Sequence, residues 1–177
     1  PWLQFRILDG DPPGEQEIDG VENGVYSVSA GDPIREFTPY TEDEVVATRL
    51  FEFKRRNGAW QVNQKYFSPR RTDATPLLNS CERWILKNGG GGWFHPIHIH
   101  LEAQQVQVYD DMTKDDPDFP TEYRWNTDLV NLEGGTEAEV FVKFRTFKGP
   151  FVCHCHIIEH EDMRMMITFD PREAGEE

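Results

Sequence analysis

Short apolar runs rich in β-branched and aromatic residues recur along most of the chain, and turn residues separate them. Alternating apolar and polar positions within such runs are typical of half-buried β-strands. The runs occupy residues 2–8, 48–53, 59–62, 82–86, 98–109, 128–132, 138–144, 150–155 and 165–169. The turns between them include an Asn57-Gly58 pair, a glycine run at residues 89–92 and a Gly134-Gly135 pair,. The pattern predicts an all-β fold, an antiparallel sandwich or barrel.

Three segments depart from this pattern. Residues 9–44 are rich in glycine, proline and acidic residues and have little periodicity, which indicates a linker or extended loop,. Residues 110–124 are interpreted as a long, solvated acidic loop, with a substrate-facing lid as the alternative,. A short helical segment is expected only at residues 156–162. We therefore expect residues 1–46 to be the end of a preceding domain and an acidic linker, and residues 47–177 to be one compact C-terminal domain,.

The composition limits the classes of partner. The 177 residues include 32 acidic and 18 basic side chains, which give a formal net charge of -14. This charge repels nucleic acids and anionic membranes and favours cations or neutral small molecules. No apolar run approaches the roughly 18 residues that a membrane span requires, and the opening residues "PWLQFRIL" carry no signal-peptide pattern and look internal to a longer protein,. Three cysteines cannot all pair within the chain, so a disulfide scaffold is not expected,.

The histidines point to metal binding. All six lie in two short stretches, "HPIHIH" at residues 95–100 and "HCHIIEH" at residues 154–160. A lone buried histidine is more often a hydrogen-bonded core residue than a ligand. Six histidines concentrated in two motifs, one of them interleaved with cysteine, favour a metal site.

Strand parity divides these side chains into two groups, because successive residues of a strand point to opposite faces. His98 and His100 share one face of their strand. In the second motif His154 and His156 share one face, and Cys155 points the other way. The parity predicts two metal centres, one with four imidazoles and one that pairs Cys155 with His95.

Residues just beyond the second strand can complete the cysteine-containing centre. His160 follows Cys155 by five positions and Met165 follows it by ten, so a short turn can bring both back to the thiolate. Two histidines, one cysteine and a weak axial thioether form the ligand set of blue copper. Zinc is the rival metal, but an axial methionine has no role in a zinc site.

The two motifs resemble the copper-binding motifs of multicopper oxidases, in their C-terminal cupredoxin domain. The wider stretches "FEFKRRNGAWQVNQKYF" and "ERWILKNGGGGWFHPIHIHLE" are similar to the branch of bilirubin oxidase, phenoxazinone synthase and spore-coat laccase. The resemblance covers residues 48–170 and implies a cupredoxin-like Greek-key β-sandwich. It implies that type 1 copper is held by His95, Cys155, His160 and Met165, type 2 copper by His98, and binuclear type 3 copper by His100, His154 and His156.

The resemblance also implies a laccase-like activity. Single electrons from a small-molecule or metal-ion donor enter at the type 1 copper, with Cys155 and His160 among its catalytic ligands, and pass along Cys155 to its neighbours His154 and His156. A trinuclear copper cluster then reduces dioxygen to water. In that family an N-terminal domain supplies two further His-x-His pairs, which this sequence lacks. We therefore expect a partner domain, in the same protein or in another chain, and a secreted or periplasmic location.

Some residues carry weaker signals. In the resembling branch an acid at the position of Glu161 delivers protons, although a solvated acid on the ligand loop is the alternative,. Asp128 resembles an acid that orients a ligand histidine, with a strand-start hydrogen bond as the alternative,. Cys153 is expected to be a buried thiol, and Cys81 a free thiol or a partner for a missing domain,. The aromatic residues Trp60, Trp84, Trp93 and Phe94 are expected to pack in the core or in turns.

A different class of function uses only part of these ligands. An electron-transfer cupredoxin needs the type 1 site alone. That function leaves four of the histidines unexplained, namely His98, His100, His154 and His156.

Overall fold

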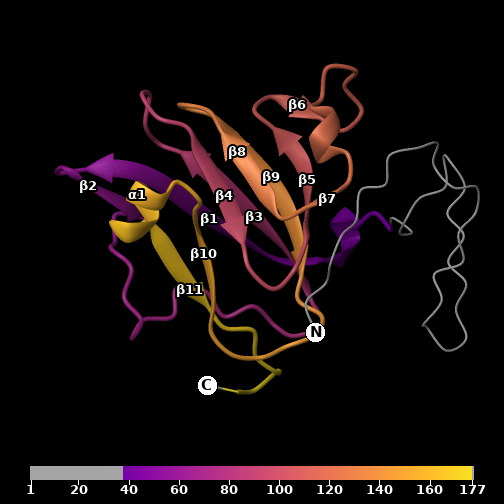
Figure 1. Ribbon diagram of the computed structural model, residues 1–177. Helices are drawn as coiled ribbons and strands as arrows, with labels where there is room; N and C mark the ends of the chain where they lie inside the picture. The colour runs from indigo at the N-terminus through magenta and orange to yellow at the C-terminus, as the bar shows by residue number, and fades with distance from the viewer. Residues whose placement is uncertain (1–37, 177) are drawn as a thin grey trace, which may run out of the picture. The chain divides into compact units, whose positions relative to one another are not determined.

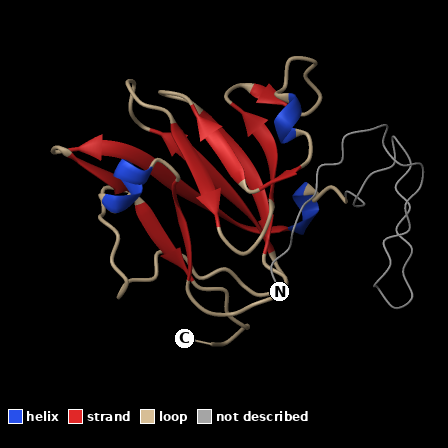
Figure 2. Ribbon diagram, viewed as in Figure 1, coloured by secondary structure: helices blue, strands red, loops and turns tan. Residues whose placement is uncertain are grey.

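The computed structural model describes residues 38–176, which form two β-sheets packed face to face (Figures 1 and 2). The larger sheet contains β1 (Val45–Arg56), β2 (Ala59–Val62), β3 (Cys81–Asn88), β5 (Gln104–Tyr109), β6 (Met112–Thr113), β7 (Asn126–Thr127) and β9 (Glu137–Lys143). The smaller sheet contains β4 (His95–Ile99), β8 (Leu129–Leu132), β10 (Phe151–Cys155) and β11 (Met166–Phe169). The helical segments are η1 (Glu42–Glu44), η2 (Thr121–Tyr123) and α1 (Ile158–Asp162). The two-sheet β-sandwich expected from the sequence is therefore confirmed.

The strand pairing departs from a purely antiparallel pattern at one place. The larger sheet has the order β2-β1-β3-β9-β5-β6, with β7 on β5, and the smaller sheet has the order β11-β10-β4-β8. Among the described strand pairs, β1 and β3 run parallel and the others run antiparallel. A parallel pair needs a long connection, and residues 63–80 supply it between β2 and β3.

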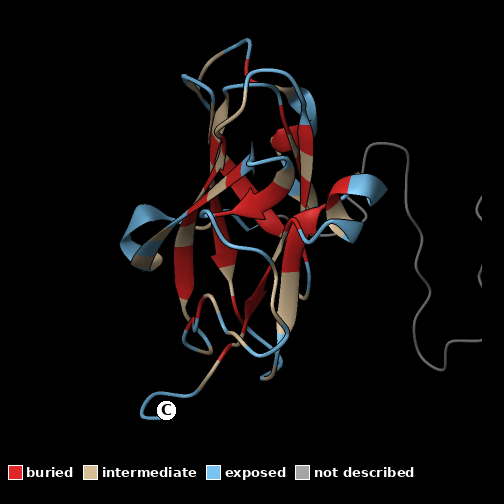
Figure 3. Ribbon diagram, turned by 90° about the vertical axis from the view of Figure 1, so that its left-hand side faces the viewer, coloured by how far each residue is buried: buried red, intermediate tan, exposed pale blue. Residues whose placement is uncertain are grey.

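The core lies between the facing sheets. Trp84, Phe53 and Leu86 of the larger sheet are fully buried against Ile97 and Ile167 of the smaller sheet. Figure 3 shows the buried residues on the strands of both sheets and the exposed residues mainly in the loops. Burial of each large apolar side chain contributes about 1.5 to 3 kcal/mol. The alternation read from the sequence thus places the apolar faces of the strands inside the sandwich.

The sequence suggested one strand at residues 98–109, but the structure divides this run between the two sheets. β4 ends at Ile99 in the smaller sheet and β5 begins at Gln104 in the larger sheet. Between them Leu101 has a φ of 77°, and the Glu102 N–H donates to the His100 carbonyl at 3.0 Å. This is a γ-turn, which bends the chain sharply at a cost in backbone strain.

An ion pair anchors that bend. The buried Glu102 carboxylate accepts hydrogen bonds from the Arg145 backbone N–H at 2.8 Å and from the Arg145 guanidinium at 2.6 and 3.0 Å. These charge-assisted bonds satisfy a carboxylate that burial would otherwise destabilise. They hold the turn after β4 against the segment that joins β9 to β10.

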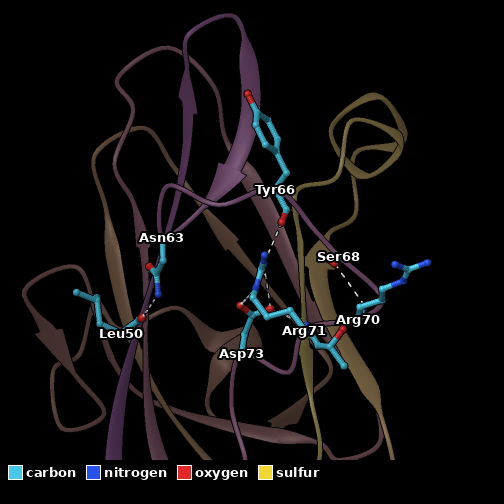
Figure 4. Close-up of polar contacts among 8 residues, drawn as sticks. Leu50, Asn63, Tyr66, Ser68, Arg70, Arg71 and Asp73 are labelled. Carbon is cyan, nitrogen blue, oxygen red and sulfur yellow. Dashed lines mark hydrogen bonds and ion pairs between the residues drawn. The ribbon is translucent and has the colours of Figure 1, made fainter.

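The long connection between β2 and β3 is tied to its surroundings by polar contacts (Figure 4). The Asn63 side-chain amide donates to the Leu50 carbonyl at 2.7 Å, and Arg71 donates to the Tyr66 carbonyl at 2.9 Å and to the Asp73 carboxylate at 2.6 Å. The Asp73 N–H in turn donates to the Thr168 carbonyl at 2.7 Å. The Asn63 bond attaches the connection to β1, and the Asp73 bond attaches it to β11.

Residues 38–46, which the sequence assigns to the linker, make contacts with the larger sheet. The Tyr40 N–H donates to Gln105 Oε1 at 2.8 Å, Glu42 forms an ion pair with Arg83, and Glu44 forms one with Lys143. Residues 38–46 therefore belong to the same compact unit as the two sheets. The strand expected at residues 2–8 and most of the expected linker lie outside the described residues.

The acidic segment at residues 110–124 is more ordered than a plain solvated loop. It contains β6 and η2, and it buries Phe119 and Tyr123. Arg124 donates to the Lys114 carbonyl at 2.9 Å and to the Asp116 carbonyl at 2.8 Å, which closes the segment on itself. Across residues 38–176, no helix has the length and apolar character that a membrane span requires.

Candidate metal centres

Three buried side chains converge in the interior near one end of the sandwich. Cys155 Sγ lies 3.6 Å from His95 Nδ1 and 3.4 Å from His160 Nδ1, and the two Nδ1 atoms lie 3.2 Å apart. His95 opens β4, Cys155 ends β10 and His160 lies in α1. We call His95, Cys155 and His160 the first centre.

The spacing and chemistry of the first centre fit a metal ion. Donor atoms that share one ion at about 2.0 to 2.3 Å lie about 3 to 4 Å from one another. The three donor atoms meet this condition with two imidazole nitrogens and one sulfur. A thiolate beside two imidazoles suits copper or zinc.

Burial determines the protonation of the first centre without a metal. Desolvation lowers the pKa of His95 to about 4, with a further contribution from the neighbouring His160. Desolvation also lowers the pKa of His160 and raises the pKa of Cys155 to about 11. At neutral pH the imidazoles are therefore neutral and ready to coordinate, whereas the thiol must release a proton to bind a metal.

Met165 adjoins the first centre through the backbone. Its N–H donates to the His160 carbonyl at 3.0 Å, and its carbonyl accepts a hydrogen bond from the Cys155 N–H at 3.1 Å. The Met165 residue is fully buried. Its backbone thus bonds to both Cys155 and His160, and it lies next to them in the fold.

Four imidazoles form a second group, which we call the second cluster and which consists of His98, His100, His154 and His156. His100 Nε2 lies 3.2 Å from His154 Nε2. The ring centroid of His98 lies 4.8 Å from that of His100 and 5.5 Å from that of His154, and the ring centroids of His156 and His154 lie 5.4 Å apart. Unlike the first centre, this cluster is open, because His100 and His156 are exposed and only His154 is buried.

Two hydrogen bonds orient imidazoles of the second cluster. His98 Nδ1 lies 2.7 Å from the Asp128 carbonyl oxygen, so Nδ1 donates and Nε2 is left for a metal,. The sequence suggested the Asp128 carboxylate for this role, but the backbone carbonyl performs it. His154 Nδ1 lies 3.1 Å from the Cys155 carbonyl and 3.3 Å from Glu161 Oε2, which leaves its Nε2 directed at His100.

Burial and mutual repulsion favour the neutral form of His100 and His154. Desolvation lowers the pKa of His100, and the neighbouring His98 and His154 lower it further. Desolvation also lowers the pKa of His154, although its bond to the Cys155 carbonyl and the charge of Glu161 oppose the shift. Neutral imidazoles with free Nε2 atoms are the form that binds metal ions.

The two groups divide as the strand parity predicts. In the smaller sheet His154 pairs with His98 and Cys155 pairs with Ile97. Neighbouring residues of β10 therefore project to opposite faces. Cys155 faces the interior and the first centre, and His154 faces the second cluster.

Aromatic rings cover the first centre. Trp60 is buried and its ring centroid lies 3.6 Å from that of His160, whereas Trp84 packs in the core as expected. Trp93 and Phe94 lie in the connection between β3 and β4 and are 54% and 46% exposed, so they are turn residues of the two kinds expected. Trp93 makes an edge contact with the His160 ring at 5.6 Å. Sequence patterns missed these contacts because they do not show which rings from distant parts of the chain pack together.

The other two cysteines lie outside both groups. Cys153 and Cys81 are buried free thiols, and desolvation raises the pKa of each, that of Cys81 to about 11. Cys153 pairs with Ile99 and Ile167 on the neighbouring strands. This agrees with the expectation of a buried thiol at position 153.

The sequence and fold match one family of known proteins. The sequence profile of the family described as "Multicopper oxidase" matches residues 39–175. A laccase from Haloferax volcanii is 32% identical over 172 residues, which cover 94% of this chain and 28% of the relative. Bilirubin oxidase from Albifimbria verrucaria is 32% identical over 146 residues, which cover 75% of this chain and 23% of the relative. This chain thus spans less than a third of the length of these relatives.

The fold is also found in solved structures. A crystal structure of a laccase from Pediococcus acidilactici superposes with a TM-score of 0.71 at 22% identity, over 84% of this chain and 32% of that chain. The similarity establishes the cupredoxin-like fold of the described residues.

Proposed function

Because the chain belongs to the multicopper oxidase family, we propose that it is the C-terminal, copper-binding part of a laccase-like oxidase. One observation carries the proposal. Adjacent residues of β10 serve two groups of metal donors, since Cys155 belongs to the first centre and His154 to the second cluster. With copper bound, the two groups would supply one-electron oxidation of a donor and four-electron reduction of dioxygen to water.

The residues of the first centre suit type 1 copper. His95 and His160 would bind through Nδ1 and Cys155 through Sγ, and Met165 would supply its thioether,. Soft sulfur and a thioether favour copper over zinc. Burial of the four residues excludes water from this centre.

The second cluster suits half of a trinuclear copper site. His98 would bind type 2 copper, and His100, His154 and His156 would bind type 3 copper. The backbone connects Cys155 directly to His154 in β10 and to His156 just after β10, and it offers electrons a short covalent path between the two groups.

Glu161 is proposed to deliver protons for oxygen reduction. Its carboxylate lies 3.3 Å from His154 Nδ1 and is partly exposed. A carboxylate in this position connects solvent to the edge of the second cluster.

A partner unit would supply the remaining imidazoles of the cluster. The exposure of His100 and His156 leaves one side of the cluster uncovered, and the relatives are more than three times as long as this chain. We propose an N-terminal cupredoxin domain, from the same protein or from another chain, as this partner. The electron donor is a small molecule or a metal ion, and the net charge of -14 favours cationic or neutral donors,. A secreted or periplasmic location belongs to the same proposal.

A second candidate function follows from the contrast between the two groups. The first centre is complete within this chain, whereas the second cluster is open. An electron-transfer cupredoxin would need the first centre alone. This candidate leaves the convergence of the four imidazoles without a role.

Copper counting and oxygen uptake test the proposal. We expect Cu(II) to turn the 177-residue chain blue, because a copper thiolate is strongly coloured and a zinc thiolate is not. The whole oxidase should hold four copper ions per assembly and consume dioxygen with a reducing donor. A single copper ion and no oxygen uptake would support the electron-transfer candidate, and a colourless copper-treated chain would overturn both.

A further inference from the structure

Trp60 touches both imidazoles of the first centre. Its ring lies 3.6 Å from that of His160, centroid to centroid, with an interplanar angle of 32°. It also meets the ring of His95 edge-on, at 5.5 Å and 81°. Trp60 is 6% exposed, so this contact lies within the interior. The Trp60 indole thus stacks on the ring of His160 and makes an edge-on contact with the ring of His95.

A tight hairpin turn holds Trp60 in this place. Asn57 and Gly58 have φ values of 52° and 81°, which suit a two-residue turn,. The turn pairs Arg55 with Trp60 across β1 and β2. The Arg55 guanidinium carbon lies 5.5 Å from the centroid of the Trp60 ring, a distance at which a cation is attracted to an indole,.

The Trp60 ring also limits the access of water to His160. Trp93 contacts the rings of both Trp60 and His160, at 5.8 and 5.6 Å, and it is 54% exposed. His160 itself is only 2% exposed. The apolar shell around a metal site controls solvent access and thereby the reduction potential.

We propose that Trp60 is a positioning residue for copper at the first centre, which holds the His160 ring by stacking and raises the reduction potential by excluding water. The inference rests on the proposed function, because it presupposes copper bound by His95, Cys155 and His160. Water near the ligands stabilises the oxidised ion, which carries the larger charge, more than the reduced ion. Loss of the indole should therefore shift the one-electron equilibrium toward Cu(II).

Potentiometric titration of the copper-loaded 177-residue chain tests the inference. We expect Trp60→Ala to shift the reduction equilibrium about tenfold toward Cu(II), which equals about 59 mV for a one-electron couple. The copper hyperfine splitting in paramagnetic resonance should change with it, because the freed imidazole adopts a different orientation. Trp60→Phe keeps an aromatic cover and should restore most of both properties.

Two further variants separate positioning from stability. Trp84→Phe removes another buried indole, which packs on Phe144 and Phe169 and away from the first centre, and it should leave potential and splitting unchanged. Trp60→Leu keeps apolar bulk without stacking and provides a folded variant if Trp60→Ala does not fold. An unchanged hyperfine splitting in folded Trp60→Leu, which lacks the stacked ring, would overturn the inference. A chain that never turns blue, even without substitution, would overturn the copper centre itself.

Discussion

Cys155 and His154 are neighbours on β10 and serve opposite faces of the same sheet. Cys155 Sγ lies 3.4 Å from His160 Nδ1 in the interior, and His154 Nε2 lies 3.2 Å from His100 Nε2 on the other face. A strand is well suited to this division because its side chains alternate between faces. One peptide unit thus joins the two groups of donors.

The two groups differ in solvent access. His95, Cys155 and His160 are buried, whereas His100 and His156 of the second cluster are exposed. A closed site can bind an ion within one chain, but an open one leaves coordination positions for other ligands. This difference suits a chain that completes one centre alone and shares the other.

Substitution of the sulfur ligand should remove the blue colour. Cys155→Ser replaces the thiolate of the first centre with a hydroxyl, so the copper-thiolate absorption should be lost. Cys153→Ala is the matched control, because Cys153 is buried on the same strand but pairs with Ile99 and Ile167. Absorption spectroscopy of both copper-treated variants measures the effect. Colour retained in Cys155→Ser would contradict the assignment.

Removal of the Glu161 carboxylate should slow oxygen reduction. Glu161→Gln keeps the size of the side chain that lies 3.3 Å from His154 Nδ1 but removes its titratable proton. We expect kcat of the whole oxidase to fall about a hundredfold, as for loss of a general acid, while the blue absorption stays unchanged. Steady-state oxygen uptake measures kcat. Asp162→Asn, an exposed neighbour, is the control, and an equal loss in both variants would contradict a specific role for Glu161.

The metal-free chain should lose stability as the pH falls below 6.5. The pKa of His95 is about 4 in the folded chain and 6.5 ordinarily, so between these values the unfolded chain binds a proton that the folded chain does not. The stability is fully present above pH 6.5 and declines toward pH 4. Burial lowers the pKa values of His100, His154 and His160 in the same direction.

Urea unfolding at several pH values checks this expectation. We expect the free energy of unfolding to fall by about 2 kcal/mol between pH 7.5 and pH 4.5. His95→Gln cannot take up this proton and should reduce the dependence. Carboxylates with a lowered pKa, such as that of Glu44 beside Lys143, change the stability only at lower pH, where they take up protons. A constant unfolding midpoint from pH 7.5 to pH 5 would contradict the prediction.

Loss of Arg145 should destabilise the bend after β4. Arg145→Ala leaves the carboxylate of Glu102, which is 4% exposed, without its guanidinium partner. We expect the free energy of unfolding, measured with urea, to fall by about 2 to 3 kcal/mol, because an unpaired buried charge is costly. Lys148→Ala breaks ion pairs with the exposed Glu173 and Glu176 and should cost less than about 1 kcal/mol,. Equal losses in the two variants would contradict the role of burial.

Local patterns in the sequence predict the strands and the division of the donors well. Period-two alternation identifies β1, β2 and β10, and parity separates Cys155 from His154, because both follow from the geometry of a single strand,. Spacing places His160 within reach of Cys155 for the same reason, since a five-residue turn is local. The identities of the ligand side chains restrict the metal through their chemistry.

Other features depend on contacts between segments far apart in the chain, which local patterns do not contain. The run at residues 98–109 divides at Leu101 because Arg145, 43 residues after Glu102, anchors the turn. The parallel pairing of β1 with β3 likewise depends on how the connection between β2 and β3 crosses the sandwich.

The sequence by itself determined which residues can bind a metal and on which face of its own strand each lies, because side-chain chemistry and strand parity are local. Only the tertiary structure decided that Trp60 stacks on His160, that the Asp128 carbonyl orients His98, and that the second cluster is open to solvent. These features arise where strands from different parts of the chain pack together, and their energies come from contacts that exist only in the folded state.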